Sequence, residues 1–280
     1  MLHDERRMLK HRLKAYKSLK QINFIYNKDR PWNSIMESIF HRASCLHCRL
    51  STLCLPYGLK QDEINKLESI VKQKRPIKSD EHLFRQDEEC QSLFAVKSGS
   101  FRSFIADNDG AEQTIGFYLP GELKGLDALK DGHLHCSVIA LETASVCELP
   151  LADLNELCSQ IPSLQAQVMR IIGSQIVSDH DKIVLLGNRS AREKMATFLL
   201  MLSQRYNALG YSGTEFNLTM RRHDIANFLG LTIETVSRQL GNLSRLGIIS
   251  VKQRGIQINK LDSLKMIVEP CLPNHFSFIN

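Results

Sequence analysis

The chain has 280 residues, of which 43% are hydrophobic and 24% are charged. At about 100–200 residues per domain, this length predicts two globular domains. No stretch approaches the roughly 18 consecutive apolar residues of a membrane-spanning helix, and the N-terminus lacks the apolar core of a secretory signal. These features exclude a helical membrane protein, and we expect a cytoplasmic protein with no membrane partner.

The net charge of +6 is distributed unevenly along the chain. Residues 1–30 hold nine Lys/Arg against three Asp/Glu, residues 31–188 hold fifteen against twenty-one, and residues 189–260 hold eleven against four. A basic C-terminal part behind an acidic one is typical of a two-part nucleic-acid-binding protein. Ordinary variation of surface charge is the alternative.

Residues 81–149 alternate between short apolar runs and turn residues such as Asp107-Asn-Asp-Gly110. Strands at this spacing predict a small antiparallel barrel or sandwich. The expected strands are 92–96, 101–106, 114–119, 137–141 and 145–149, and a helix at 151–158 follows Pro150.

Residues 162–188 predict a long helix with an apolar seam. From Gln165, the 4-3-4-3 spacing of a coiled coil selects six further positions, and five of the seven are apolar. These positions are Met169, Ile172, Ile176, Asp179, Ile183 and Leu186. The stripe could pack against its own domain, but a helix of about 25 residues between two modules favours a twin helix in a homodimer. Asp179 is the one ionisable seam residue, and two buried copies would oppose dimerisation.

A helix-turn-helix is the most readable motif of the chain. With Arg222 as position one, Ala226 falls at position five, Gly230 at nine and Val236 at fifteen. A small residue lets the two helices approach, glycine permits the tight turn, and the β-branched residue packs inward. Two short apolar runs around residues 252–255 predict a β-hairpin wing.

The second helix of this motif predicts the DNA contacts. Glu234, Ser237 and Arg238 are spaced i, i+3 and i+4, so they project from one face. Arginine can bind guanine O6 and N7, glutamate can accept from cytosine N4, and serine can serve either partner. A surface salt bridge between Glu234 and Arg238 is the alternative. Within a helix-turn-helix that has a basic wing, we favour reading of double-stranded DNA.

Three of the eight cysteines, Cys45, Cys48 and Cys54, lie within ten residues. A disulfide framework is not expected in a chain without a secretory signal, so the cluster indicates a metal or redox centre. Three ligands complete neither a tetrahedral zinc nor a cubane, so a fourth must come from elsewhere. Spacing does not choose among the candidates, which are Cys90, Cys136, Cys147, Cys158, Cys271, His41 and His47.

From residue 43 to about residue 262, the chain resembles the Crp–FNR superfamily of bacterial transcription regulators, in particular its fumarate and nitrate reduction branch. The resemblance rests on Cys48 and Cys54 with five residues between them, and on three longer stretches. These are Leu-Phe-Ala-Val-Lys-Ser-Gly at 93–99, Leu-Glu-Thr-Ala-Ser-Val-Cys-Glu-Leu-Pro at 141–150 and Glu-Thr-Val-Ser-Arg at 234–238. It implies an α+β fold with an antiparallel β-roll sensor domain of the cyclic-nucleotide-binding type, a long dimerisation helix and a C-terminal winged helix-turn-helix.

The resemblance also implies a function, which is not enzymatic. It implies an oxygen-labile 4Fe–4S cluster bound by Cys45, Cys48, Cys54 and Cys147. The cluster-bearing form would be a homodimer that binds a palindromic DNA site, recruits RNA polymerase partly through the loop around Gly110, and regulates genes of anaerobic respiration. Oxygen would degrade the cluster and dissociate the dimer.

The expected organisation has four parts: a basic extension at 1–44, the cluster-binding segment and β-roll at 45–161, the dimerisation helix at 162–188 and the DNA-binding domain at 189–280. The extension exceeds the usual start of the family. It would be a DNA-touching arm, a solvated tail or the product of a misassigned start, with Met8 or Met36 as the true one. His47 and Arg49 also depart from the family pattern and would alter the oxygen response.

Three alternatives remain at this point. A Crp-like regulator could respond to a different ligand, since residues 121–123 resemble a cyclic-nucleotide pocket; however, no arginine lies between Arg102 and Arg170 to grip a phosphate. A zinc-stabilised DNA-binding protein would use the same cysteines. An iron–sulfur or redox enzyme is disfavoured, because the chain has no Gly-rich dinucleotide loop.

Overall fold

The computed structural model describes residues 44–187 and 189–268. The basic extension before residue 44, His41 and Cys271 lie outside the described residues. Within them, no helix has the length and hydrophobicity needed to span a membrane.

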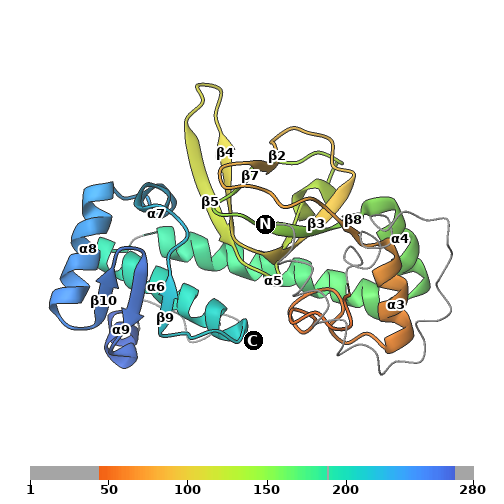
Figure 1. The fold of residues 1–280 in the computed structure, drawn as a ribbon. Coiled ribbons are helices and arrows are strands. Elements are labelled where there is room, and N and C mark those ends of the chain that lie inside the picture. Colours follow the sequence, from red (N-terminus) through yellow and green to blue (C-terminus); the bar gives the residue numbers. More distant parts are fainter. Residues whose placement is uncertain (1–43, 188, 269–280) are drawn as a thin grey trace, which may run out of the picture. The chain divides into compact units, whose positions relative to one another are not determined.

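The first part of the fold is a roll of two four-stranded antiparallel sheets (Figure 1). One sheet has the order β1 (Lys72–Gln73), β8 (Ser145–Pro150), β3 (Ser92–Ser98) and β6 (Leu123–Lys124). The other has the order β2 (His82–Phe84), β7 (Ser137–Ala140), β4 (Phe101–Ala106) and β5 (Glu112–Tyr118). The expected antiparallel roll is therefore confirmed.

Strand alternation gives the first sheet two apolar faces. Phe94 and Val96 of β3 pack inward with Phe101 and Val138 of the second sheet. Leu93 and Ala95 point the other way, where three helices cover them. These helices are α3 (Gln61–Ile70), α4 (Leu151–Gln160) and the beginning of α5 (Pro162–Leu186), and a short 3-10 helix, η2 (Leu126–Leu129), follows β6.

Helix α5 begins with Pro162, which is tolerated in the first turn because the missing N–H would have had no helical partner. Its predicted seam is exposed for most of its length. Met169, Ile176 and Ile183 have 60%, 51% and 69% of their surface exposed, and Asp179 and Leu186 are exposed as well. Ile172 differs, because it is half-buried against the apolar cluster beneath the first sheet. An exposed apolar stripe is typical of a protein–protein interface. The dimer itself stays a prediction.

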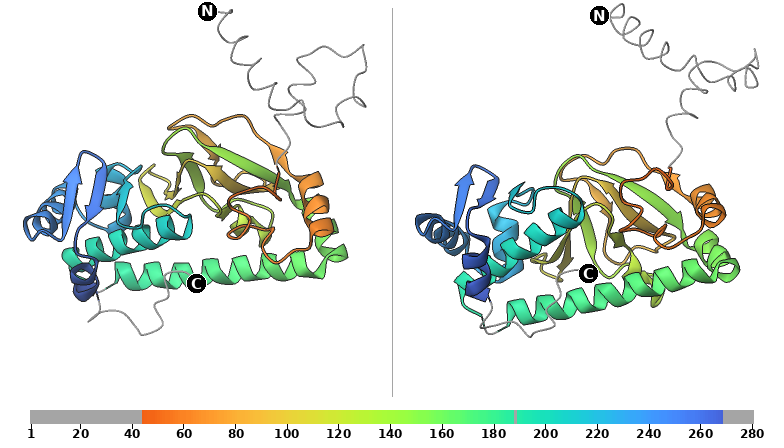
Figure 2. Two further views of the ribbon diagram at one scale, coloured as in Figure 1. Left: turned by 60° about the horizontal axis from the view of Figure 1, so that its bottom comes forward. Right: turned by 90° about the horizontal axis from the view of Figure 1, so that it is seen from below.

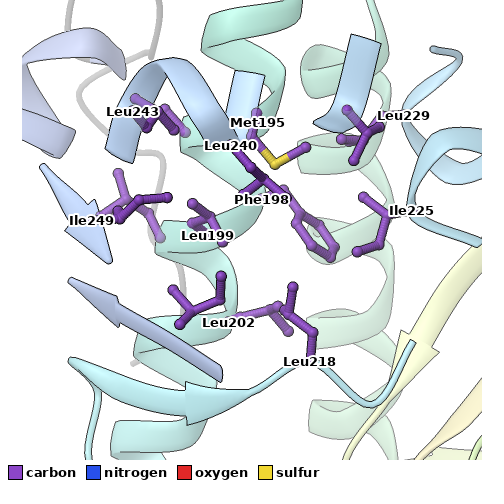
Figure 3. Close-up of a cluster of buried hydrophobic side chains, with 14 of the residues drawn as sticks. Met195, Phe198, Leu199, Leu202, Leu218, Ile225, Leu229, Leu240, Leu243 and Ile249 are labelled. Carbon is purple, nitrogen blue, oxygen red and sulfur yellow. The ribbon is translucent and has the colours of Figure 1, made fainter. Parts of the chain in front are cut away.

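The DNA-binding part is built around α6 (Ala191–Ala208), which starts with a capping box between Ser190 and Glu193. Figure 3 shows Met195, Phe198, Leu199 and Leu202 of this helix at the centre of the core. The surrounding elements are α7 (Arg222–Leu229), α8 (Ile233–Arg245), α9 (Leu261–Val268) and a sheet of order β10 (Ile249–Lys252), β11 (Gly255–Ile258) and β9 (Glu215–Asn217). The predicted wing is the β10–β11 hairpin, and β9 extends it to three strands.

Candidate metal centre and nucleic-acid interface

The segment from Cys45 to Tyr57 is a series of tight turns. The backbone N–H of Cys48 donates to the carbonyl of Cys45 (3.3 Å), that of Ser51 to Cys48 (3.1 Å), and that of Tyr57 to Cys54 (3.2 Å). Backbone hydrogen bonds that close short loops in succession curl the chain back on itself. We call residues 45–57 the cysteine loop.

The fourth cysteine reaches this loop through strand pairing. Cys147 lies on β8 opposite Ala95 of β3, on the sheet face that also carries Leu149. One pocket is lined by all four cysteines, Cys45, Cys48, Cys54 and Cys147. The rest of its lining is mostly apolar and includes one charged residue, Lys97. Of the other candidates for a fourth ligand in the described part of the chain, Cys90, Cys136, Cys158 and His47 do not line it. The structure thus gathers the four cysteines that the resemblance implied.

Burial controls the chemistry of these thiols. It raises the pKa of Cys45 and the pKa of Cys54 to about 12 each, and it also raises the pKa of Cys147. The Lys97 ammonium opposes this effect on the pKa of Cys45 and of Cys147. With pKa values of about 12, the Cys45 and Cys54 thiols keep their protons at neutral pH, so a bound metal centre would have to compensate the charge of their thiolates.

Zinc and a cubane would use the four thiols differently. Among residues 44–187 and 189–268, no three His, Cys, Asp or Glu side chains lie close enough together to hold a single metal ion. A structural zinc needs all four ligands on one ion. A cubane attaches each thiolate to a different iron, so its ligands stand farther apart. The pocket lining supplies the four thiols that either group requires.

The two residues that depart from the family pattern are exposed beside this pocket. The ring of His47 pairs with Ser44, whose Oγ lies 3.1 Å from Nδ1, and the Arg49 side chain faces solvent. Neither lines the pocket. Their direct influence on a bound group would therefore be electrostatic.

The helix-turn-helix has the local geometry that its spacing predicted. Helix α7 ends at Gly230, whose φ of +62° and ψ of 42° are left-handed and favour glycine. Helix α8 is capped by Thr232, whose hydroxyl accepts from the Thr235 N–H at 3.2 Å. Ala226 and Val236 are buried between the helices, with 3% and 0% of their surface exposed.

The three predicted base-reading side chains share the outer face of α8. Glu234, Ser237 and Arg238 are all exposed. Arg238 donates to the Thr235 hydroxyl at 3.3 Å, and the described residues contain no ion pair between Glu234 and Arg238. Hydrogen bonds from its own backbone N–H and from Thr232 lower the pKa of Glu234, so the carboxylate remains an acceptor. The salt bridge considered as the alternative does not form here.

The cyclic-nucleotide alternative meets a structural obstacle. Glu122, within the stretch that resembles a nucleotide pocket, binds Arg205 of α6 through both oxygens, at 2.7 and 2.8 Å. The Arg205 guanidinium also donates to the Phe117 carbonyl at 2.7 Å. Arg102 is buried and pairs with Glu112 and Asp224. The Glu122 carboxylate and the guanidinium groups of Arg102 and Arg205 are therefore already paired within the chain.

Comparison with known proteins gives the family. Residues 193–267 match the Crp-like helix-turn-helix domain, and residues 74–161 match the cyclic nucleotide-binding domain. The Anaerobic regulatory protein of Aggregatibacter actinomycetemcomitans is 43% identical over 220 residues, which cover 79% of this chain and 86% of that protein. The Fumarate and nitrate reduction regulatory protein of Escherichia coli (strain K12) is 41% identical over 223 residues, covering 80% of this chain and 89% of that protein.

A solved structure extends the similarity to three dimensions. FixK2 from Bradyrhizobium japonicum superimposes with a TM-score of 0.65 at 28% identity, covering 71% of this chain and 97% of that one. The chain therefore belongs to the family of fumarate and nitrate reduction regulatory proteins, which are DNA-binding transcription regulators of the Crp–FNR superfamily and not enzymes.

Proposed function

We propose that the protein is an oxygen-sensing regulator of genes for anaerobic metabolism. A 4Fe–4S cluster on Cys45, Cys48, Cys54 and Cys147 would promote dimerisation and sequence-specific DNA binding when oxygen is absent. The observation that carries this proposal is the single pocket lined by all four cysteines. The names of the curated relatives, which refer to anaerobic regulation and to fumarate and nitrate reduction, support it.

The bound cluster would supply the reactivity toward oxygen, while the chain supplies the ligands, an apolar surrounding and a nearby positive charge. Leu55, Leu67 and Leu149 restrict water around the thiols. Lys97 brings a positive charge toward a centre that would carry net negative charge. Reduced thiols require a reducing compartment, so the proposal includes a cytoplasmic location.

The output of the sensor would be a symmetric DNA complex. A dimer through Met169, Ile172, Ile176, Asp179, Ile183 and Leu186 of α5 would present two copies of α8 to a palindromic site. Glu234, Ser237 and Arg238 would contact bases, while Lys252 and Arg254 of the wing would contact phosphates. The exposed turn at Gly110, between β4 and β5, would be available to RNA polymerase.

Anaerobic purification tests the proposal. We expect a brown protein with about four iron and four sulfide ions per chain, whose visible absorption is lost in air. A colourless protein with one zinc per chain would instead support the zinc-stabilised alternative. The variant Cys158→Ser is the matched control, because Cys158 is a half-buried cysteine that does not line the pocket.

A further inference from the structure

One buried amide joins the cysteine loop to the long helix. Gln167 lies on α5 with 5% of its surface exposed. Its Nε2 donates to the backbone carbonyl of Cys54 at 3.0 Å, and its Oε1 accepts from Nε of Arg170 at 2.8 Å. Both ends of the amide are therefore used, and one of them holds the backbone of a proposed cluster ligand.

Arg170 strengthens this connection. Its guanidinium lies over the ring of Tyr57, 4.4 Å from the ring centroid. The N–H of Tyr57 donates to the same Cys54 carbonyl that Gln167 binds. Gln167 and Arg170 thus hold both ends of the turn from Cys54 to Tyr57, and we call this pair the loop clamp.

The loop clamp and the seam occupy different sides of α5. At 3.6 residues per turn, Gln167 is about 140–160° around the helix axis from Met169 and Ile172. One side of α5 therefore contacts the cysteine loop, while most of the apolar seam lies on the other side; Ile172 is the seam residue that also packs against the cluster around Leu55. Figure 2 shows that α5 is continuous over this stretch, so a shift of one side moves the other.

Burial makes the clamp sensitive to the position of the loop. A buried amide that loses its partner costs about 1–3 kcal/mol. If the Cys54 carbonyl moves, Gln167 either follows it, which displaces α5, or is left without an acceptor. The loop and the helix are therefore energetically coupled through this side chain.

We propose that Gln167 is a positioning residue that transmits the state of the cysteine loop to the dimerisation seam, with Arg170 holding its amide in place. This inference rests on the proposed function, because it presupposes a cluster on the loop and a dimer on α5. Gln167 does not line the pocket of the four thiols, so we assign it no role as a cluster ligand.

Two substitutions at one position test the coupling in anaerobically purified full-length protein. Gln167→Met fills similar volume but removes both hydrogen bonds. Gln167→Glu keeps an acceptor for Arg170 but no longer donates to Cys54. Gln160→Met is the matched control, since Gln160 is an exposed glutamine on α4 whose side chain bonds only within its own helix. Iron and sulfide content, the circular dichroism spectrum and the dimer dissociation constant from sedimentation are measured for each.

We expect both Gln167 variants to retain wild-type iron, sulfide and helical content while dimerising roughly tenfold more weakly. The control should match the wild type. Dimerisation at wild-type strength with a full cluster overturns the inference. Loss of iron and sulfide in both variants also overturns it, because Gln167 would then only maintain the cluster site. A wild-type protein without iron would refute the proposed function itself, which separates the two failures.

Discussion

The charge of Asp179 in the dimer seam gives a prediction with a calculable size. The carboxylate lies between Ile176 and Ile183 on the exposed side of α5. The sequence predicts that Asp179 is a lone charge, but the structure gives it two partners within the helix. Its Oδ1 accepts from Nζ of Lys182 at 2.8 Å and from Nε2 of Gln175 at 2.9 Å.

These partners reduce the cost of bringing two carboxylates together. With 53% of its side chain exposed, Asp179 gains only about 0.3–0.5 kcal/mol from such a helical pair. Burying an unpaired ion costs several kcal/mol, and partial burial beside Lys182 reduces this to about 1 kcal/mol per chain. Asp179→Ala should therefore stabilise the dimer by about 2 kcal/mol, or roughly 30-fold in dissociation constant.

Sedimentation velocity of protein purified in air measures this effect. We expect Asp179→Ala to sediment as a dimer at micromolar concentration, where the cluster-free wild type is a monomer. Lys182→Met should weaken the dimer of the anaerobically purified, cluster-bearing protein, because it leaves the carboxylate uncompensated. In the double variant the effect of Lys182→Met should vanish, since its target is gone.

Two results would refute this reasoning. One is an Asp179→Ala protein that remains monomeric at the concentrations used for the wild type. The other is a Lys182→Met effect that persists without Asp179. Lys182 would then act through Tyr118, whose ring centroid lies 5.8 Å from its Nζ.

Three further predictions concern the cysteines and the DNA interface. Cys147→Ser should lose iron and sulfide while Cys158→Ser keeps them, and a full iron complement in Cys147→Ser would show that the fourth ligand is another residue. In cluster-free protein, Cys45 and Cys54 should resist alkylation by iodoacetamide at pH 9. Their raised pKa values of about 12 keep both thiols protonated at a pH where an ordinary thiol is largely ionised. Rapid labelling of both cysteines, measured by mass spectrometry, would contradict this prediction. Arg238→Ala should reduce the free energy of DNA binding by about 1–3 kcal/mol per half-site and relax the preference at one G·C pair. Lys252→Ala should instead weaken binding to all DNA sequences and flatten the salt dependence of binding. Unchanged discrimination between half-site variants in Arg238→Ala would rule out base reading by this side chain.

Local patterns predicted the elements whose residues are close in sequence. The strand at 101–106 and the turn at Gly230 were correct, because turn residues and helix spacing are local signals. The strand expected to begin at residue 114 begins at Glu112, since polar residues on its exposed end carry no apolar signal. Strands β1, β2, β6 and β9 were missed because two or three residues cannot show alternation.

Long-range features lay beyond the reach of spacing. Cys147 joins the cysteine loop only because β8 pairs with β3 in the register that sets it opposite Ala95. Gln167 was missed because a polar residue away from the seam of an amphipathic helix indicates a solvent-facing position. Its burial depends on the cysteine loop, more than one hundred residues earlier in the chain. Lys97 is exposed in the structure, and only the assembled pocket shows that it borders the four cysteines.

The central claim is that one group, held by four cysteines, controls both dimerisation and DNA binding. The most direct measurement follows a single anaerobically purified sample by sedimentation and by binding to a palindromic DNA, before and after exposure to air. We expect a DNA-binding dimer that becomes a monomer with weak, non-specific DNA affinity as the visible absorption disappears. A protein that remains a dimer and keeps its DNA affinity after complete loss of iron would contradict the account.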